Sequence, residues 1–385
     1  MKIVIASDSF KENLTSLQVA THIEKGIHKV LPKAKCTKVP MADGGEGTVQ
    51  ALVDATQGNI IRKKVTGPDN IQVTARYGIL GDGVTGVIEM AEASGLHLTS
   101  RESRNPLKMT SYGTGELIAD AMKKGIETII IGLGGSATVD GGAGMVQALG
   151  VRFLDKSGEE ITENLGGGML KNIATIDMSQ VNPLIKKTKV IIACDVVNPL
   201  AGKKGAAYVF GPQKGATPAQ VKTLDDNLKY FGQLLKTQLK KDVATKPGAG
   251  AAGGLGAALM AFTRATTKRG VDLVVKVVEL EKHLKGADLV ITGEGRIDFQ
   301  TAFGKTPAGV AKAAKKFKVP VIAIGGALAD DAPGVFEHGI HGLDSAVCQP
   351  MSLEDALKNS KKYLEFAGER VIRTVLIGQK MAREK

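Results

Sequence analysis

Short apolar runs alternate with amphipathic helical segments along this 385-residue chain, and this alternation is the strongest constraint on its fold. Near the N-terminus the apolar run 3–6 is followed by Thr15 and Ser16, which are typical helix-capping residues, and then by an amphipathic stretch to about Val30. The same pattern recurs near the other end as a strand, a helix, a strand and a long helix, at residues 288–292, 307–317, 320–324 and about 353–376. Alternation of this kind predicts an α/β protein with a mostly parallel sheet.

The residue pattern in the middle of the chain differs from that at the two ends, which predicts a second domain. Residues 71–77 alternate with period two and Gly81-Asp82-Gly83 is typical of a hairpin turn, so we expect antiparallel strands there. The simple alternation resumes after Gly286. We therefore expect residues 1–66 and 286–385 to form a doubly wound, Rossmann-like α/β domain, with residues 67–285 inserted as a mixed α/β domain.

Composition excludes several classes of protein. Hydrophobic residues make up 43% and charged residues 23%, which is ordinary globular usage and excludes disorder, collagen or a coiled coil as the main architecture. The net charge is +12, but the lysines are spread over helix-like segments and aromatic residues are only 4%, which argues against a surface that stacks nucleic-acid bases. The apolar runs are too short for a signal peptide or for the ~20-residue span of a membrane, so we expect a cytoplasmic protein.

Three cysteines, Cys36, Cys194 and Cys348, form neither a disulfide framework nor a zinc-binding spacing. Glycine-rich segments are better candidates for chemistry, because glycine lets backbone N–H groups approach an oxyanion and a following helix adds a favourable dipole. There are four such segments, at residues 44–45, 132–144, 248–256 and 304–307. In the last one, Thr306 is expected to cap a helix that has Pro307 at its first position. With Lys305 beside it, this segment predicts an anion-binding pocket.

Two familiar nucleotide motifs are matched only superficially. Gly304-Lys305-Thr306 resembles the end of a P-loop, but the first glycine of that pattern would fall at Phe299. Residues 132–137 match the dinucleotide-binding fingerprint, yet Asp140-Gly141-Gly142 interrupts the helix that should follow directly. An NAD-dependent oxidoreductase of a small hydroxy acid is therefore an alternative with weak support.

Acidic side chains follow the predicted strands at their carboxyl ends, which is where open α/β sheets bind ligands. These residues are Asp8, Asp43, Glu46, Asp140, Asp195, Glu294 and Asp298. Each one could instead cap a helix or pair with a neighbouring cation, but as a set they favour a ligand or metal site. Lys11 and Arg296 are the cations placed to neutralise phosphate or carboxylate oxygens.

Several longer motifs, in order over nearly the whole chain, resemble those of the type I glycerate kinases. The matching segments are 6–11, 40–48, 110–117, 132–144, 193–196, 210–216, 247–256 and 292–298. One departure is local: in this family a Gly and a small polar residue usually follow the lysine of the first motif, whereas Glu12 and Asn13 follow Lys11 here.

The resemblance implies that ATP, with Mg²⁺, phosphorylates D-glycerate in a cleft between two α/β domains. The expected products are ADP and 2-phosphoglycerate, with 3-phosphoglycerate as the other option. It implies ATP and a small-molecule substrate as partners, and neither nucleic acid nor a membrane. The oligomeric state stays open, a homodimer included. An alternative of another class is a basic nucleic-acid-binding or metabolite-sensing protein without catalysis.

On the kinase hypothesis, Asp195 or Asp43 is the base that takes the proton of the substrate hydroxyl, and Lys11 and Arg296 hold the carboxylate or the transferring phosphoryl group. Metal ligands are expected among Asp195, Glu294 and Asp298. Residues expected to bind substrate or phosphate are Asp8, Ser9, Gly44, Gly45, Gly134, Gly135, Ser136, Glu294, Lys305 and Thr306.

Overall fold

The computed structural model describes residues 1–384, and the chain divides into two compact units. Unit 1 consists of residues 1–43, 50–57 and those from 270 onward, and unit 2 consists of residues 44–49 and 58–269. The divisions thus fall near residues 57 and 269, where the sequence suggested 66 and 285. Residues 59–66 lie in unit 2 because they pair along their whole length with residues 72–79.

Unit 1 has a five-stranded parallel sheet in the order β13-β12-β11-β1-β2. The strands are β1 (Lys2–Ser7), β2 (Lys35–Lys38), β11 (Leu289–Ile297), β12 (Val321–Leu328) and β13 (Gly342–Ser345). The helices are α1 (Ser16–Val30), α2 (Thr48–Thr56, in this unit from Gln50), α9 (Gly270–Val277), α10 (Leu280–Leu284), α11 (Thr306–Lys315), α12 (Leu353–Lys358) and α13 (Ser360–Arg383), with 3₁₀ helices η6 (Phe299–Phe303) and η7 (Ala332–His338).

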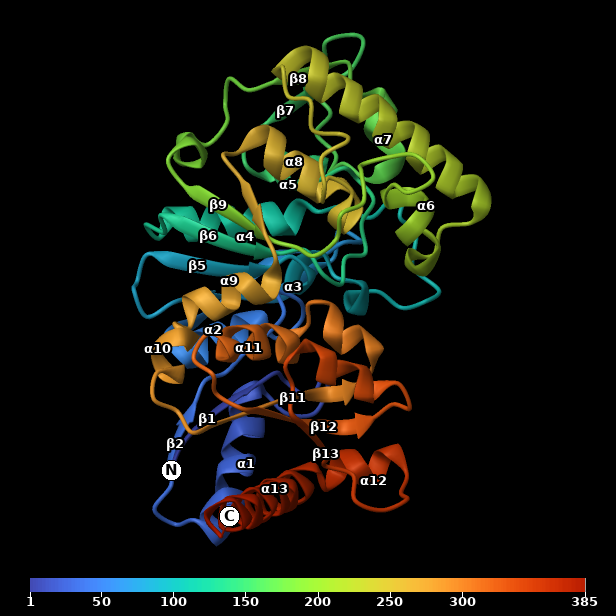
Figure 1. Cartoon of the computed structure of the whole chain (residues 1–385). Helices are drawn as coiled ribbons and strands as arrows, with labels where there is room; N and C mark the ends of the chain where they lie inside the picture. The colour runs from blue at the N-terminus through green and yellow to red at the C-terminus, as the bar shows by residue number, and fades with distance from the viewer. Residues whose placement is uncertain (385) are drawn as a thin grey trace. The chain divides into compact units, whose positions relative to one another are not determined.

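Helices cover both faces of this sheet, which confirms the doubly wound prediction. The α1 and α13 helices lie on one face, and α11 with α9 and α10 lies on the other (Figure 1). The chain leaves β1 through α1 and leaves β11 through α11, so the direction of winding changes between these two adjacent strands. Ligands of open α/β sheets bind at such a switch point, beyond the carboxyl ends of the strands.

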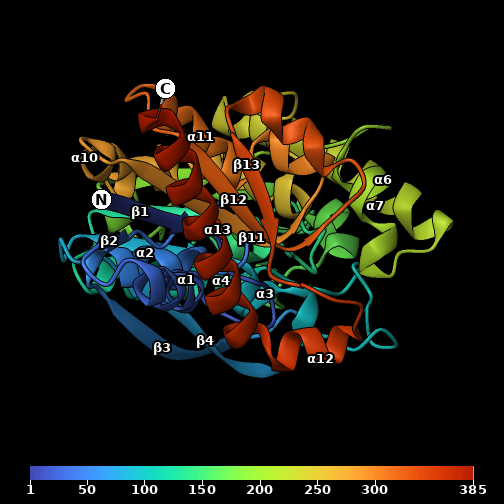
Figure 2. The same cartoon turned by 60° about the horizontal axis from the view of Figure 1, so that its bottom comes forward.

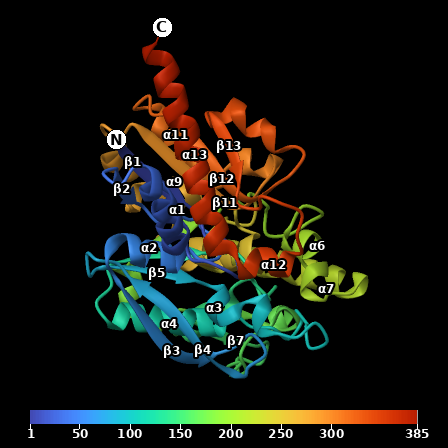
Figure 3. The same cartoon turned by 90° about the horizontal axis from the view of Figure 1, so that it is seen from below.

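The α1–α13 contact covers one face of the unit 1 sheet (Figures 2 and 3). Thr15 forms a full capping box with Gln18 at the start of α1, as its residue type predicts. Glycine permits the close packing, because a methyl group at Gly26 would collide with the carbonyl oxygen of Glu365. The single long helix expected over 353–376 is instead two, because the backbone of Asn359 (φ −105°, ψ 9°) leaves the helical region between α12 and α13.

Unit 2 has a six-stranded mixed sheet in the order β10-β9-β6-β5-β4-β3 and a separate β7-β8 pair. The strands are β3 (Asn59–Thr66), β4 (Gln72–Ile79), β5 (Thr85–Glu89), β6 (Thr128–Gly132), β7 (Arg152–Leu154), β8 (Thr175–Asp177), β9 (Lys189–Ala193) and β10 (Thr266–Lys268). The predicted antiparallel hairpin is confirmed: β4 pairs antiparallel with β3 and β5, and Asp82 accepts hydrogen bonds from the backbone of Val84 and Thr85 in the turn.

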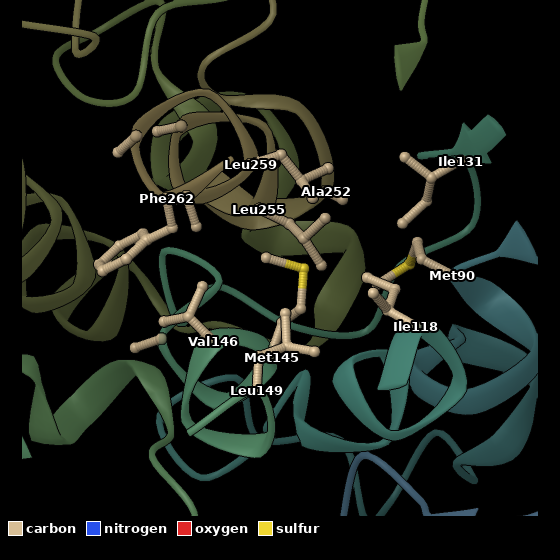
Figure 4. Close-up of a cluster of buried hydrophobic side chains, with 14 of the residues drawn as sticks. Met90, Ile118, Ile131, Met145, Val146, Leu149, Ala252, Leu255, Leu259 and Phe262 are labelled. Atoms are coloured by element: carbon tan, nitrogen blue, oxygen red, sulfur yellow. The ribbon is translucent and has the colours of Figure 1, made fainter. Parts of the chain in front are cut away.

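The helices of unit 2 are α3 (Ala91–Ser94), α4 (Tyr112–Lys123), α5 (Ala143–Ala148), α6 (Ala206–Phe210), α7 (Pro218–Leu239) and α8 (Leu255–Phe262), with 3₁₀ helices η1 (Leu96–Leu98), η2 (Gly167–Asn172), η3 (Pro183–Lys186), η4 (Pro212–Lys214) and η5 (Ala251–Gly254). Its core is largely aliphatic, with a few aromatic residues such as Phe262, and Met145 of α5 and Leu255 and Leu259 of α8 belong to it (Figure 4). Across residues 1–384, none of the helices has the length and apolar character that a membrane crossing requires.

Candidate active site

A pocket of about 410 Å³ opens in unit 1 at the switch point between β1 and β11. Eight of the residues singled out from the sequence line it, namely Asp8, Ser9, Lys11, Asp43, Glu294, Arg296, Asp298 and Lys305. They come from four separate segments of the chain, which parallel strand pairing brings to one edge of the sheet. The pocket therefore gathers charged residues of three matched motifs and of the predicted anion-binding loop.

The β11 strand positions two of these residues differently from the sequence-based expectation. The segment after Thr292 was expected to be a loop, but β11 continues to Ile297, with Glu294 opposite Gly325 and Arg296 opposite Ala327 of β12. Side chains two residues apart on a strand lie on the same face, so Glu294 and Arg296 both line the pocket.

Asp8 is the most perturbed carboxylate of the pocket. Its Oδ1 accepts a hydrogen bond from the Ser9 backbone N–H (2.7 Å), and its Oδ2 accepts one from the Thr306 hydroxyl (2.5 Å). Burial raises the pKa of Asp8 to about 7, and the nearby Asp43 carboxylate adds to the increase. Thr306 contacts Asp8 rather than lining the pocket itself. It is the first residue of α11 and not its N-cap as expected, because the N-cap position is held by Lys305.

Glu294, Asp298 and Lys305 form a second group. The Lys305 Nζ lies 3.3 Å from Glu294 Oε2 and 3.7 Å from Asp298 Oδ1, and the Thr301 hydroxyl donates to Glu294 Oε1 at 2.6 Å. Burial raises the pKa of Glu294, while Thr301 and Lys305 oppose the increase. Asp298 also caps η6 by accepting from the Gln300 N–H.

The glycine-rich loop 132–144 builds a different kind of site in unit 2. The loop packs on the Gly44-Gly45 turn so closely that a methyl group at Gly132 would lie 2.8 Å from the Gly44 carbonyl oxygen. The Ser136 hydroxyl and the Thr138 carbonyl accept hydrogen bonds from the Lys214 Nζ at 2.8 and 2.7 Å. Desolvation lowers the pKa of Lys214 to about 7, against the opposing effect of Asp140. Gly44, Gly134 and Ser136 thus lie in one cluster of unit 2.

Asp140 holds the far end of that loop. Its carboxylate is fully buried and accepts hydrogen bonds from the backbone and hydroxyl of Ser111 (2.8 and 2.6 Å) and from the backbones of Gly142 and Gly144 (3.0 and 3.3 Å). These bonds fix the chain at the start of α5, which is the capping role that any strand-end aspartate can play. Glu89, at the end of β5, holds the turn after Gly45 in the same way, by accepting from Gly47 and Val49.

Asp195 follows β9 in unit 2, and its carboxylate lies 3.6 Å from the Arg269 Nε. Glu294 and Asp298, the other two predicted metal ligands, lie in unit 1. A shared metal site of these three residues therefore stays a prediction, and so does the cleft between domains.

Sequence reasoning missed Lys214, Glu89 and Ser111. Lys214 lies inside a motif that supported the family resemblance, but lysine is rarely buried, so nothing local marks it as an interior residue. Ser111 also lies in a matched motif, but its role could be recognised only from its hydrogen bond to Asp140.

Comparison with known proteins agrees with this arrangement. Residues 3–376 match the model of the glycerate kinase family. The chain is 55% identical to the glycerate kinase of Halalkalibacterium halodurans, over 96% of this chain and 97% of the relative. It is 50% identical to the glycerate 2-kinase of Escherichia coli, over 99% of this chain and 100% of the relative.

A crystal structure from Salmonella typhimurium LT2, provisionally assigned as glycerate kinase 2, matches with a TM-score of 0.90 and 49% identity over 99% of both chains. The chain belongs to the glycerate kinase family. These relatives support neither the oxidoreductase nor the non-catalytic alternatives. In the segment that resembles a dinucleotide fingerprint, Ser136 instead accepts a hydrogen bond from Lys214, as does Thr138 just after it.

Proposed function

We propose that this protein transfers the γ-phosphoryl group of ATP to a hydroxyl of D-glycerate, with ADP and phosphoglycerate as products. The observation that carries the proposal is the pocket at the switch point of unit 1, where the charged residues of motifs shared with glycerate kinases converge. The 2-hydroxyl is the favoured acceptor, because a relative that aligns over its full length is named a glycerate 2-kinase.

Phosphoryl transfer requires positioning, neutralisation of the phosphate charge and a base for the attacking hydroxyl. Lys11, Arg296 and Lys305 supply the positive charge in the pocket. Asp43 lines the same pocket, and Asp195 follows β9 in unit 2; these are the two candidates for the base. Asp8, with a pKa near 7, lies close enough to Asp43 for repulsion between the two carboxylates to raise its pKa.

The donor set fits Mg²⁺ through Glu294 and Asp298. Mg²⁺ is usually held by one or two carboxylates together with water and substrate phosphates. The Lys305 ammonium lies near carboxylate oxygens of both Glu294 and Asp298, so these oxygens face the same positive charge. If Mg²⁺ binds here, Glu294 and Asp298 would hold it, and it would supply positive charge to neutralise the charge that develops during transfer. The role of Asp195 as a third ligand is part of the same proposal.

The glycine-rich loop 132–144 is proposed to contact substrate or phosphate through Gly134, Gly135 and Ser136. Gly135 has a positive φ of 71°, a conformation in which glycine carries little strain. Lys214 and Asp140 would then act as positioning residues, because each holds the loop through hydrogen bonds from within the unit.

The direct test is ADP release from ATP and Mg²⁺ by the purified protein, with D-glycerate, with L-glycerate and without an acceptor. We expect release only with D-glycerate, and a ³¹P NMR signal of 2-phosphoglycerate. A signal of 3-phosphoglycerate would correct the position, whereas no acceptor-dependent release from folded protein would refute the kinase.

The base is identified by comparing Asp43→Asn with Asp195→Asn in the same assay. Loss of a general base typically costs about 10²–10⁴ in rate. We expect a fall in kcat of that size in one variant, with circular dichroism unchanged. Near-normal turnover in either variant removes that residue from the catalytic set.

A further inference from the structure

The unit 1 pocket is lined by apolar as well as charged residues, and the apolar ones are called its apolar wall here. This wall consists of residues from the loop after β1, the segment after β13, α12 and the start of α13, namely Phe10, Ala346, Val347, Leu353, Ala356, Leu357 and Tyr363. Leu353 is 75% exposed and Leu357 is 41% exposed, so two leucines lie against the pocket with little protein covering them. Leucine side chains gathered at the mouth of a pocket favour an apolar ligand surface.

This apolar wall is held in place by hydrogen bonds. The Asn13 side chain donates to the Leu357 carbonyl oxygen at 2.8 Å, and its amide oxygen accepts from the Ser360 hydroxyl at 2.7 Å. Asn13 therefore ties the loop that carries Lys11 to the junction of α12 and α13. A wall fixed in this way is preorganised, which lowers the entropy cost of binding.

The chemistry of the two reactants decides which one fits. Glycerate has three carbons, and each of them carries oxygen, so it offers no surface that an apolar wall would remove from water. ATP has a polar triphosphate at one end and a flat, largely apolar purine at the other. A pocket of about 410 Å³ lined by both charged and apolar residues can accommodate both parts of such a molecule.

We propose that the apolar wall of unit 1 binds the adenine ring of ATP, with the triphosphate directed to Lys305, Arg296 and Lys11. The inference rests on the proposed function, because it takes ATP as the phosphoryl donor. Lys305 immediately precedes the ten-residue helix α11, whose N-terminal backbone N–H groups add to the positive potential near this residue.

The test separates binding of the ring from binding of the phosphates. Titration calorimetry would compare ATP with inorganic tripolyphosphate, which lacks the adenosine, for the wild type and for Leu353→Ser/Leu357→Ser. We expect the wild type to bind ATP more tightly than tripolyphosphate. The double variant should lose about tenfold in ATP affinity, or ~1.4 kcal/mol, with unchanged tripolyphosphate affinity.

Ile377→Ser is the matched control, because Ile377 is an exposed aliphatic residue of α13 that does not line the pocket. It should bind both ligands as the wild type does. Leu357→Met, which keeps an apolar side chain of similar volume, should retain ATP affinity. Equal losses for ATP and tripolyphosphate in the double variant, or no loss for ATP, would overturn the inference.

The outcomes also separate this inference from the proposed function. Glycerate-dependent ADP release together with unaltered ATP binding in the double variant would refute the adenine site and leave the kinase standing. Selective loss of ATP affinity without any glycerate-dependent release would support the adenine site and refute the substrate assignment.

Discussion

Unit 1 and unit 2 both place charged motif residues at strand ends, but the two units use them in opposite ways. In unit 1, Asp8, Glu294 and Lys305 border a pocket. In unit 2, Asp140 and Lys214 are 0% and 2% exposed, and their hydrogen bonds hold neighbouring loop residues such as Ser111 and Ser136. The comparison teaches that a charged residue at a strand end can either border a pocket or hold a loop from the interior of its unit.

The energetic consequences differ accordingly. The four donors around Asp140 offset the cost of burying a carboxylate, which would otherwise be several kcal/mol. Burial raises the pKa of both carboxyl groups, but at Asp8 the neighbouring Asp43 carboxylate adds to the increase, so this residue costs stability when ionised. Functional sites commonly retain such destabilising arrangements.

The largest expected effect is on the stability of unit 2. Asp140→Ala removes the acceptor of four hydrogen bonds in the interior and leaves the Ser111 and glycine N–H groups unpaired. We expect the free energy of unfolding to fall by about 3–5 kcal/mol, measured by urea denaturation followed by circular dichroism. Asp195→Ala, at an exposed strand end of the same unit, is the control and should shift the free energy of unfolding by less than about 0.5 kcal/mol. Similar losses of unfolding free energy in both variants would contradict the special role assigned to the buried Asp140.

The next effect is the pH dependence that Asp8 imposes. Because its pKa rises from 3.8 to about 7 on folding, the folded state retains a proton that the unfolded chain releases in this range. Stability is therefore lost as pH rises through that window, by an upper limit of about 4 kcal/mol at 1.36 kcal/mol for each pKa unit. Asp8→Asn cannot ionise and should remove this loss.

The measurement is urea denaturation of wild type and Asp8→Asn at pH 5 and pH 8.5. The variant should gain about 2 kcal/mol relative to the wild type between the two pH values, with reduced turnover because the carboxylate borders the pocket. Equal pH dependence in the two proteins would show that Asp8 is ionised at no cost, and the contrast with Asp140 would disappear.

The sheet of unit 1 and much of its pocket follow from sequence, because strand-end residues of parallel strands must meet at one edge. The loop after β1 and the segment 294–298 were found in this way. The continuation of β11 to Ile297 was not, since glycines and charges are typical of loops. Its pairing depends on β12, where Gly325 lies opposite Glu294.

Other features depend on contacts between residues far apart in the chain. The burial of Lys214 follows from the positions of Ser136 and Thr138, 78 and 76 residues away. The apolar wall requires Asn13 to reach α12, 344 residues further on. The local sequence pattern does not reveal partners that lie far apart in the chain. The charged residues that line the pocket could therefore be predicted, whereas its apolar lining residues could not.

The smallest effect concerns backbone strain in the two loops. In the loop of unit 2, Gly135, Gly141 and Gly142 occupy positive φ values of 71°, 65° and 76°, whereas Glu12 of unit 1 has φ 58°. Glu12 stands where the family usually has glycine, and the left-handed region costs a residue with a Cβ about 1–2 kcal/mol. Glycine also loses more backbone entropy on folding, so Glu12→Gly should gain only about 0.5 kcal/mol in urea denaturation. Glu12→Ala keeps the Cβ and should gain nothing. A gain in Glu12→Ala equal to that in Glu12→Gly would assign the effect to the lost charge, and a loss in Glu12→Gly would mean that the left-handed turn is unstrained in this chain.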